Sequence, residues 1–173
     1  EAVEDATGES WSSAWTKSHT AWKGTPDEST EGVGVLARGE LRDVQSLTFA
    51  AQGPLRRVGI GATLEPRFGG LRLWSVHLDF DDPTARAAQA RQMAARSITE
   101  ADPSLNVLVA GDFNDDVGSD AYRALPAYGF RDLSDGLDPK RIDHIFAHRG
   151  AALGLMDAHH VFDGVDSPRV SDH

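Results

Sequence analysis

The chain has 173 residues, and its 27 acidic residues against 17 Lys and Arg give a formal net charge of −10. This length is sufficient to bury the core of one domain. Proteins that hold long nucleic acids tightly neutralise phosphates with Lys and Arg, so the acidic balance argues against a stable complex with duplex DNA. The sequence has no cysteine, which excludes a disulfide framework and a thiolate metal site and leaves the cellular compartment open.

No apolar run is long enough to cross a bilayer, and we expect a monomer without a transmembrane segment. The chain begins at Glu1 rather than at a methionine, and it stops at His173. We therefore expect the sequence to be a segment of a longer protein.

Strands and helices alternate only in part along the chain. Apolar runs typical of strands lie at residues 32–37, 57–64, 71–78, 107–110 and 141–147. The clearest helix begins after Asp82, a good N-cap, with Pro83 in its first turn, and it ends before Pro103. A second, short helix is predicted over residues 119–125. Because much of the N-terminal half is strand after strand, the pattern favours a layered α/β protein with mixed sheets.

Polar residues follow two of the predicted strands at the points where the strands end. One strand ends at Val76 and runs into His77, Leu78 and Asp79, and another runs directly into Gly111, Asp112, Phe113 and Asn114. Ligands of open α/β sheets gather at the carboxyl ends of strands, so we expect these polar side chains to share one cleft. The period of two in extended chain puts Asp112 and Asn114 on one face and Phe113 in the core. A carboxylate beside an amide is a suitable cradle for a hard cation and a phosphoryl oxygen.

The same stretch can also be compared with a calcium-binding EF-hand loop. Asp112, Asn114 and Asp116 fit the first, third and fifth positions of that loop. The sixth position, however, is Val117 where glycine is required, and the twelfth is Arg123 where glutamate is required. The calcium-loop interpretation fails at both positions.

Five segments, taken in order, resemble the endonuclease/exonuclease/phosphatase superfamily. They are EGVGVLAR at 31–38, SVHLD at 75–79, GDFN at 111–114, RIDHIF at 141–146 and SDH at 171–173. The resemblance covers essentially the whole chain and implies a DNase-I-like α/β fold of four layers. In this α/β/β/α sandwich two mixed β-sheets are flanked by helices. We expect residues 1–173 to form a single domain of this kind that lacks the first strand and the first helix.

The resemblance also implies roles for individual residues. Asp112 and Asn114 would hold the attacking water and the scissile phosphate, and His77 would contact the phosphate. His173 would act as a general base or as a cationic phosphate contact. Asp143 would orient His173, as a carboxylate fixes the tautomer of a catalytic imidazole.

The family implies a divalent cation as well, namely Mg²⁺ or in its place Mn²⁺ or Ca²⁺. Its metal-binding glutamate corresponds to Glu1, and Asp172 would lie near the metal. Neighbours in an extended segment point to opposite faces, so Asp172 is poorly placed to orient His173 beside it.

We therefore predict a divalent-metal-dependent hydrolase of phosphoester bonds. The acidic charge favours a small phosphoester or a phospholipid headgroup as substrate over duplex DNA. Two alternatives stay open: an endonuclease acting on nucleic acid, and a non-catalytic binding module that retains the fold.

Overall fold

The computed structural model describes residues 2–64, 70–99, 102–148, 150–151 and 153–157. In chain order the elements are α1 (Ala2–Thr7), β1 (Trp11–Ala21), β2 (Ser29–Arg38), β3 (Leu41–Thr48), β4 (Val58–Leu64), β5 (Leu71–His77), α2 (Pro83–Thr99), β6 (Asn106–Asp112), α3 (Asp120–Ala127), β7 (Phe130–Asp132) and β8 (Asp143–His148). Strands β1 and β2 form one antiparallel sheet, and the others form a six-stranded sheet in the order β3-β4-β5-β6-β8-β7.

The six-stranded sheet is mixed. Strands β5 and β6 are parallel, with α2 as the crossover between them, and every other pair in this sheet is antiparallel. A parallel pair brings the carboxyl ends of both strands to the same edge of the sheet. The chain segments that follow β5 and β6 therefore start side by side.

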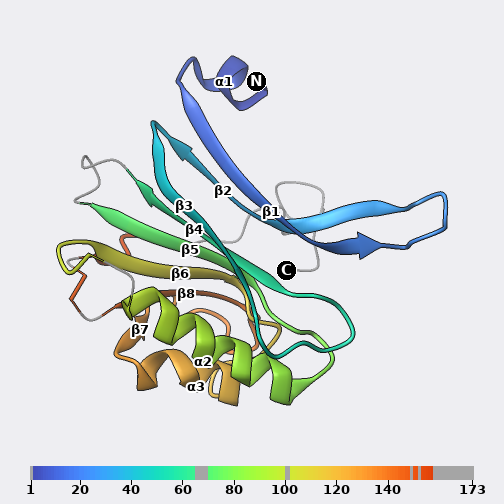
Figure 1. The fold of residues 1–173 in the computed structure, drawn as a ribbon. Helices are drawn as coiled ribbons and strands as arrows, with labels where there is room; N and C mark the ends of the chain where they lie inside the picture. Colours follow the sequence, from blue (N-terminus) through green and yellow to red (C-terminus); the bar gives the residue numbers. More distant parts are fainter. Residues whose placement is uncertain (1, 65–69, 100–101, 149, 152, 158–173) are drawn as a thin grey trace.

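The sheets and helices form layers (Figure 1). Helices α2 and α3 cover one face of the six-stranded sheet, and the β1–β2 sheet lies over its other face. The larger core cluster lies on the helix side and includes Trp74, Val109 and Phe146. A smaller cluster joins the two sheets through Val35 of β2 and Ile60 of β4. The predicted α/β sandwich with two sheets is confirmed.

The predicted helix starts are confirmed by their capping contacts. Asp82 Oδ1 accepts hydrogen bonds from the backbone N–H groups of Thr84 and Ala85, at 2.8 and 3.1 Å. Ser119 Oγ accepts from the N–H of Tyr122 at 3.1 Å. These side chains satisfy donors that a helix cannot pair internally, which explains why both helices begin there.

Strand β3 lies at an edge of the six-stranded sheet and is largely exposed. Its pairing with β4 shifts register between Arg42 and Gln45, where Asp43 has a φ of 48°. The buried side chain of Arg72 supports this bulge: Nη1 donates to Asp43 O at 2.7 Å and Nη2 to Gln45 Oε1 at 3.1 Å. The kink is thus fixed from β5, a strand of the same sheet.

Candidate active site

Three of the predicted site residues lie side by side across neighbouring strands. In the sheet register His77 of β5 is opposite Asp112 of β6, and Asp112 is opposite Asp143 of β8. The alternation of each strand sends Trp74, Val109 and Phe146 toward the helices, and so turns these three polar residues to the other face. The site therefore lies between the two sheets, at one end of the strands.

His77 and Asp112 are in direct contact. His77 Nε2 lies 3.3 Å from Asp112 Oδ2, with 37 % of the histidine side chain and 12 % of the aspartate side chain exposed. The contact with this carboxylate fixes the orientation of the imidazole. The imidazole edge remains accessible to a ligand.

The segment after Asp112 is a tight turn. Asn114 has a φ of 50°, its N–H donates to Asp112 Oδ1 at 2.7 Å, and its Nδ2 donates to Leu78 O at 3.0 Å. Phe113 is buried, and its N–H donates to Ile142 O at 2.8 Å. The predicted inward turn of Phe113 is confirmed. Because the Asn114 amide nitrogen is committed to Leu78, its carbonyl oxygen is the end that can face a ligand.

Gly111 makes close approach of the two parallel strands possible. Its φ is 138°, and a Cβ at this position would lie 2.1 Å from Val76 O on β5. No side chain fits there without a shift of the backbone. Gly111 thereby sets how near Asp112 comes to His77.

A pocket of about 400 Å³ opens beside His77, lined by residues of β1 and β2 and by Arg57 at the start of β4. Arg57 is only 3 % exposed, and no group in the described part of the chain accepts a hydrogen bond from its Nε. Burial lowers the pKa of Arg57, while the carboxylates of Asp79, Asp112 and Glu31 oppose that shift. The N–H groups of a guanidinium that lines a pocket can donate hydrogen bonds to the oxygens of an anion.

The pocket lining also includes a side-chain contact that sequence reasoning missed. His19 Nε2 of β1 lies 3.2 Å from Glu31 Oε2 of β2, and His19 Nδ1 lies 3.1 Å from Ser18 Oγ. The register of β1 against β2 shifts between Lys17 and His19, which re-aims the chain at this point. Glu31 was part of a recognised motif, but nothing in the sequence indicated its partner.

Of the remaining predicted site residues, one lies within the described part of the chain and three lie outside it. Asp143 is exposed at the first position of β8. Glu1, Asp172 and His173 lie outside the described residues. Asp79, which follows the His77 strand, is fully buried and accepts from the N–H groups of Gly53, Asp81 and Asp82, so it is a structural residue here.

The described residues include no cluster of three or more His, Asp and Glu side chains that could by itself hold a metal ion. The donor chemistry at the strand ends nevertheless suits a hard cation, because Asp112 and Asp143 place carboxylate oxygens on adjacent strands. A divalent cation there would need further oxygen ligands from another part of the chain.

The layered architecture, with acidic and imidazole groups between two sheets, defines a DNase-I-like α/β sandwich. The sequence model of the Endonuclease/Exonuclease/phosphatase family matches residues 3–173. The chain belongs to this family, whose members include phosphatases and nucleases. None of the curated proteins compared with the chain matches it significantly.

Solved structures share the fold. An endonuclease/exonuclease/phosphatase family protein from Leptotrichia buccalis C-1013-b is 20 % identical, with a TM-score of 0.74 over 99 % of this chain and 72 % of that one. The mannosyl-6-phosphatase Bt3783 of Bacteroides thetaiotaomicron VPI-5482 is 16 % identical, with a TM-score of 0.61 over 79 % and 62 % of the two chains. The human Nocturnin catalytic domain with bound sulfate is 16 % identical, with a TM-score of 0.66 over 86 % and 64 %. The chain thus spans less than two thirds of the last two proteins.

Proposed function

We propose that this protein hydrolyses a small phosphoester with the help of a divalent cation. The observation that carries the proposal is the convergence of an unsatisfied buried cation, Arg57, and the His77 imidazole on one pocket, with Asp112 in contact with the histidine. Positive groups aimed at one point stabilise the negative charge that develops on a phosphoryl group in its transition state.

The pocket and the net charge support a small substrate. A volume of about 400 Å³ is within the usual range of small-molecule sites. The formal net charge of −10 repels a long polyanion, whereas one phosphate can still reach Arg57 and His77. A soluble phosphomonoester or phosphodiester, or the headgroup of a phospholipid, fits these properties better than duplex DNA.

The proposed roles are those that the family resemblance implies, with Arg57 added because it lines the pocket. A water attacks phosphorus in line with the leaving oxygen, gives up a proton to His173, and the phosphorus bond to the leaving oxygen breaks. Asp112 and Asn114 orient the water and the phosphate, while His77 and Arg57 bind the phosphoryl oxygens. Asp143 holds the His173 imidazole in the tautomer that accepts a proton.

The divalent cation, Mg²⁺ or alternatively Mn²⁺ or Ca²⁺, would be held by the carboxylates of Glu1 and Asp172 and would neutralise charge on the phosphoryl oxygens. Carboxylates are the ligands that these cations prefer. We propose that the whole chain, residues 1–173, acts as one domain in this reaction.

The test is a panel of phosphomonoesters and phosphodiesters, assayed on the complete protein with Mg²⁺ and with a chelator. We expect chelator-sensitive hydrolysis, and a fall in kcat/KM on the order of 100- to 1000-fold for Arg57→Ala, as for loss of one transition-state donor. Asp112→Ala should lower turnover by orders of magnitude. Arg91→Ala, which removes an exposed arginine of α2 away from the pocket lining, is the control and should stay near wild type.

Chelator-resistant activity, or no activity on any substrate, would refute the hydrolase proposal. Tight and salt-sensitive binding of duplex DNA would favour the endonuclease alternative instead. Normal turnover with Arg57→Ala would show that the pocket is not where the phosphate binds.

A further inference from the structure

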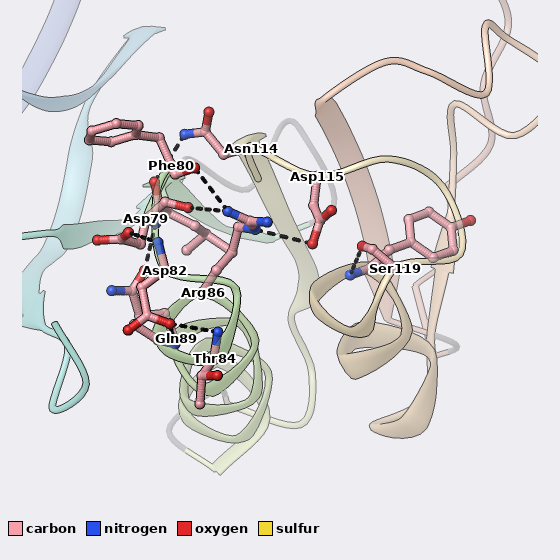
Figure 2. A network of polar contacts seen from close by, with 12 residues as sticks. Asp79, Phe80, Asp82, Thr84, Arg86, Gln89, Asn114, Asp115 and Ser119 are labelled. Atoms are coloured by element: carbon pink, nitrogen blue, oxygen red, sulfur yellow. Dashed lines mark hydrogen bonds and ion pairs between the residues drawn. The ribbon is translucent and has the colours of Figure 1, made fainter. Parts of the chain in front are cut away.

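Arg86 on the first turns of α2 connects the two loops that carry the candidate active site (Figure 2). Its side chain is 10 % exposed. Nη1 donates to Asp79 O at 3.0 Å and to Phe80 O at 3.1 Å, in the loop after β5. Nε donates to Asp115 Oδ2 at 3.1 Å, in the loop after β6. One guanidinium thus holds both loops.

The loop after β5 does not need Arg86 for its own conformation. The buried carboxylate of Asp79 already accepts from the N–H groups of Asp81 and Asp82 through Oδ1, at 3.0 and 2.8 Å. Gln89 Oε1 also accepts from the N–H of Asp79 at 2.8 Å. What Arg86 adds is the connection across to Asp115.

Asp115 is held on a second side as well. His144 Nε2 lies 2.9 Å from Asp115 O, and a carbonyl oxygen only accepts, so this ring nitrogen carries the proton. Asp115 follows Asn114 directly in the sequence, and Asn114 Nδ2 donates to Leu78 O across the same gap between the loops. Any movement of Asp115 is therefore transmitted to Asn114.

A buried charge is expensive unless it is paired, and an apolar side chain could fill the same space. The guanidinium is suited to this place because its planar fork reaches acceptors in fixed directions. Three acceptors on two loops pair with it: two backbone carbonyls of the loop after β5 and the Asp115 carboxylate of the loop after β6.

We propose that Arg86 is a positioning residue of the hydrolytic site, which fixes the loop bearing Asn114 relative to the strand end bearing His77. This inference rests on the proposed hydrolase function for its kinetic part. Arg86 acts through Asp115 and the Asp79–Phe80 backbone and does not touch the substrate. Arg86 thereby affects the orientation of the reacting groups, and small misplacements of such groups lower turnover strongly.

The kinetic test compares Arg86→Ala with Arg91→Ala, which removes an exposed arginine of the same helix. We expect kcat to fall roughly 10- to 100-fold with Arg86→Ala while KM changes less than about threefold, since alignment rather than binding is lost. Guanidinium ion at millimolar concentration should restore part of the lost kcat. Arg91→Ala should match wild type and show no rescue.

A second variant removes only the contact between Arg86 and the loop after β6. Asp115→Ala leaves Arg86 its two carbonyl partners, and its site is partly exposed, so the variant should fold even where Arg86→Ala does not. We expect it to lower kcat in the same direction, and the double variant to be no worse than the more severe single variant. Additive losses, or a kcat equal to that of Arg91→Ala, would overturn the proposal.

Hydrogen exchange can be measured without enzyme activity, so it tests the positioning role of Arg86 separately from the hydrolase function. The side-chain amide of Asn114 should exchange its hydrogens faster in Asp115→Ala than in wild type, as followed by nuclear magnetic resonance, because its bond to Leu78 O is no longer held in place. Unchanged exchange refutes the positioning role. If the wild type is inactive but exchange is still faster in Asp115→Ala, the hydrolase function is refuted. The positioning role of Arg86 is then supported.

Discussion

Gly111→Ala tests whether the spacing of β5 and β6 is set by one glycine. The added Cβ would lie 2.1 Å from Val76 O, a backbone atom that cannot rotate away. The residue would also keep a φ of 138°, which side-chain-bearing residues rarely adopt. The strands must separate or the turn must change, and both alterations move Asp112 away from His77.

The cost can be estimated from these two effects. Backbone strain of this kind costs about 1–3 kcal/mol, and overpacking by one group adds about 1–3 kcal/mol. Together they remove a large part of a domain's usual stability of about 5–15 kcal/mol. For a domain of this size, the melting temperature should fall by roughly 5 to 20 °C.

Gly118→Ala is the matched control, because it separates the two effects. Gly118 has a φ of 86°, but a Cβ there would meet only Arg123 Nη2, at 3.9 Å. It therefore reports backbone strain without the clash. Thermal and urea unfolding of both variants are the assays, and equal losses of stability in the two would refute the steric argument for Gly111.

Three further predictions concern buried polar groups beside the site. Burial lowers the pKa of His144 below its usual 6.5, so stability should be full above pH 6.5 and fall as the pH drops below it. His144→Phe should lose that acid dependence in urea unfolding, and an unchanged pH profile would contradict it. Burial and the Asp132 carboxylate raise the pKa of Tyr122 from its usual 10.0 to about 12. The free energy of unfolding should therefore fall as the pH rises from 10.0 toward 12. Tyr122→Phe should abolish this alkaline loss. Asp132→Ala leaves the mostly buried Arg141 without its carboxylate partner, and we expect a loss of about 3–5 kcal/mol in the free energy of unfolding. A loss below 1 kcal/mol, on the order of a surface pair, would show that Arg141 is solvated.

The sequence was most informative where local chemistry decides the structure. Helix α2 starts after Asp82 as predicted, because the capping carboxylate and Pro83 suit only that position. The buried Phe113 was also predicted, since alternation in extended chain is a local property. The strand ends that carry His77 and Asp112 followed from the same reasoning.

The features that could not be predicted from the sequence depend on contacts with residues far along the chain. Strands β1 and β3 were not predicted, because their side chains are mostly polar and they do not show a clean alternation of burial. Their extended conformation is supplied by pairing with β2 and β4. Arg57 stood inside a predicted strand, and only its burial and its place in the pocket make it a candidate site residue.

The bulge at Asp43 has a consequence for how the protein behaves among its neighbours. Strand β3 is an outer strand of the six-stranded sheet, and a straight outer strand presents a row of unused N–H and C=O groups on which another chain can add a strand. The kink that Arg72 secures interrupts that row. The opposite outer strand, β7, is three residues long and offers little length for pairing. Within the part of the chain that the structure describes, both borders of this sheet therefore offer little straight strand on which a second chain could pair.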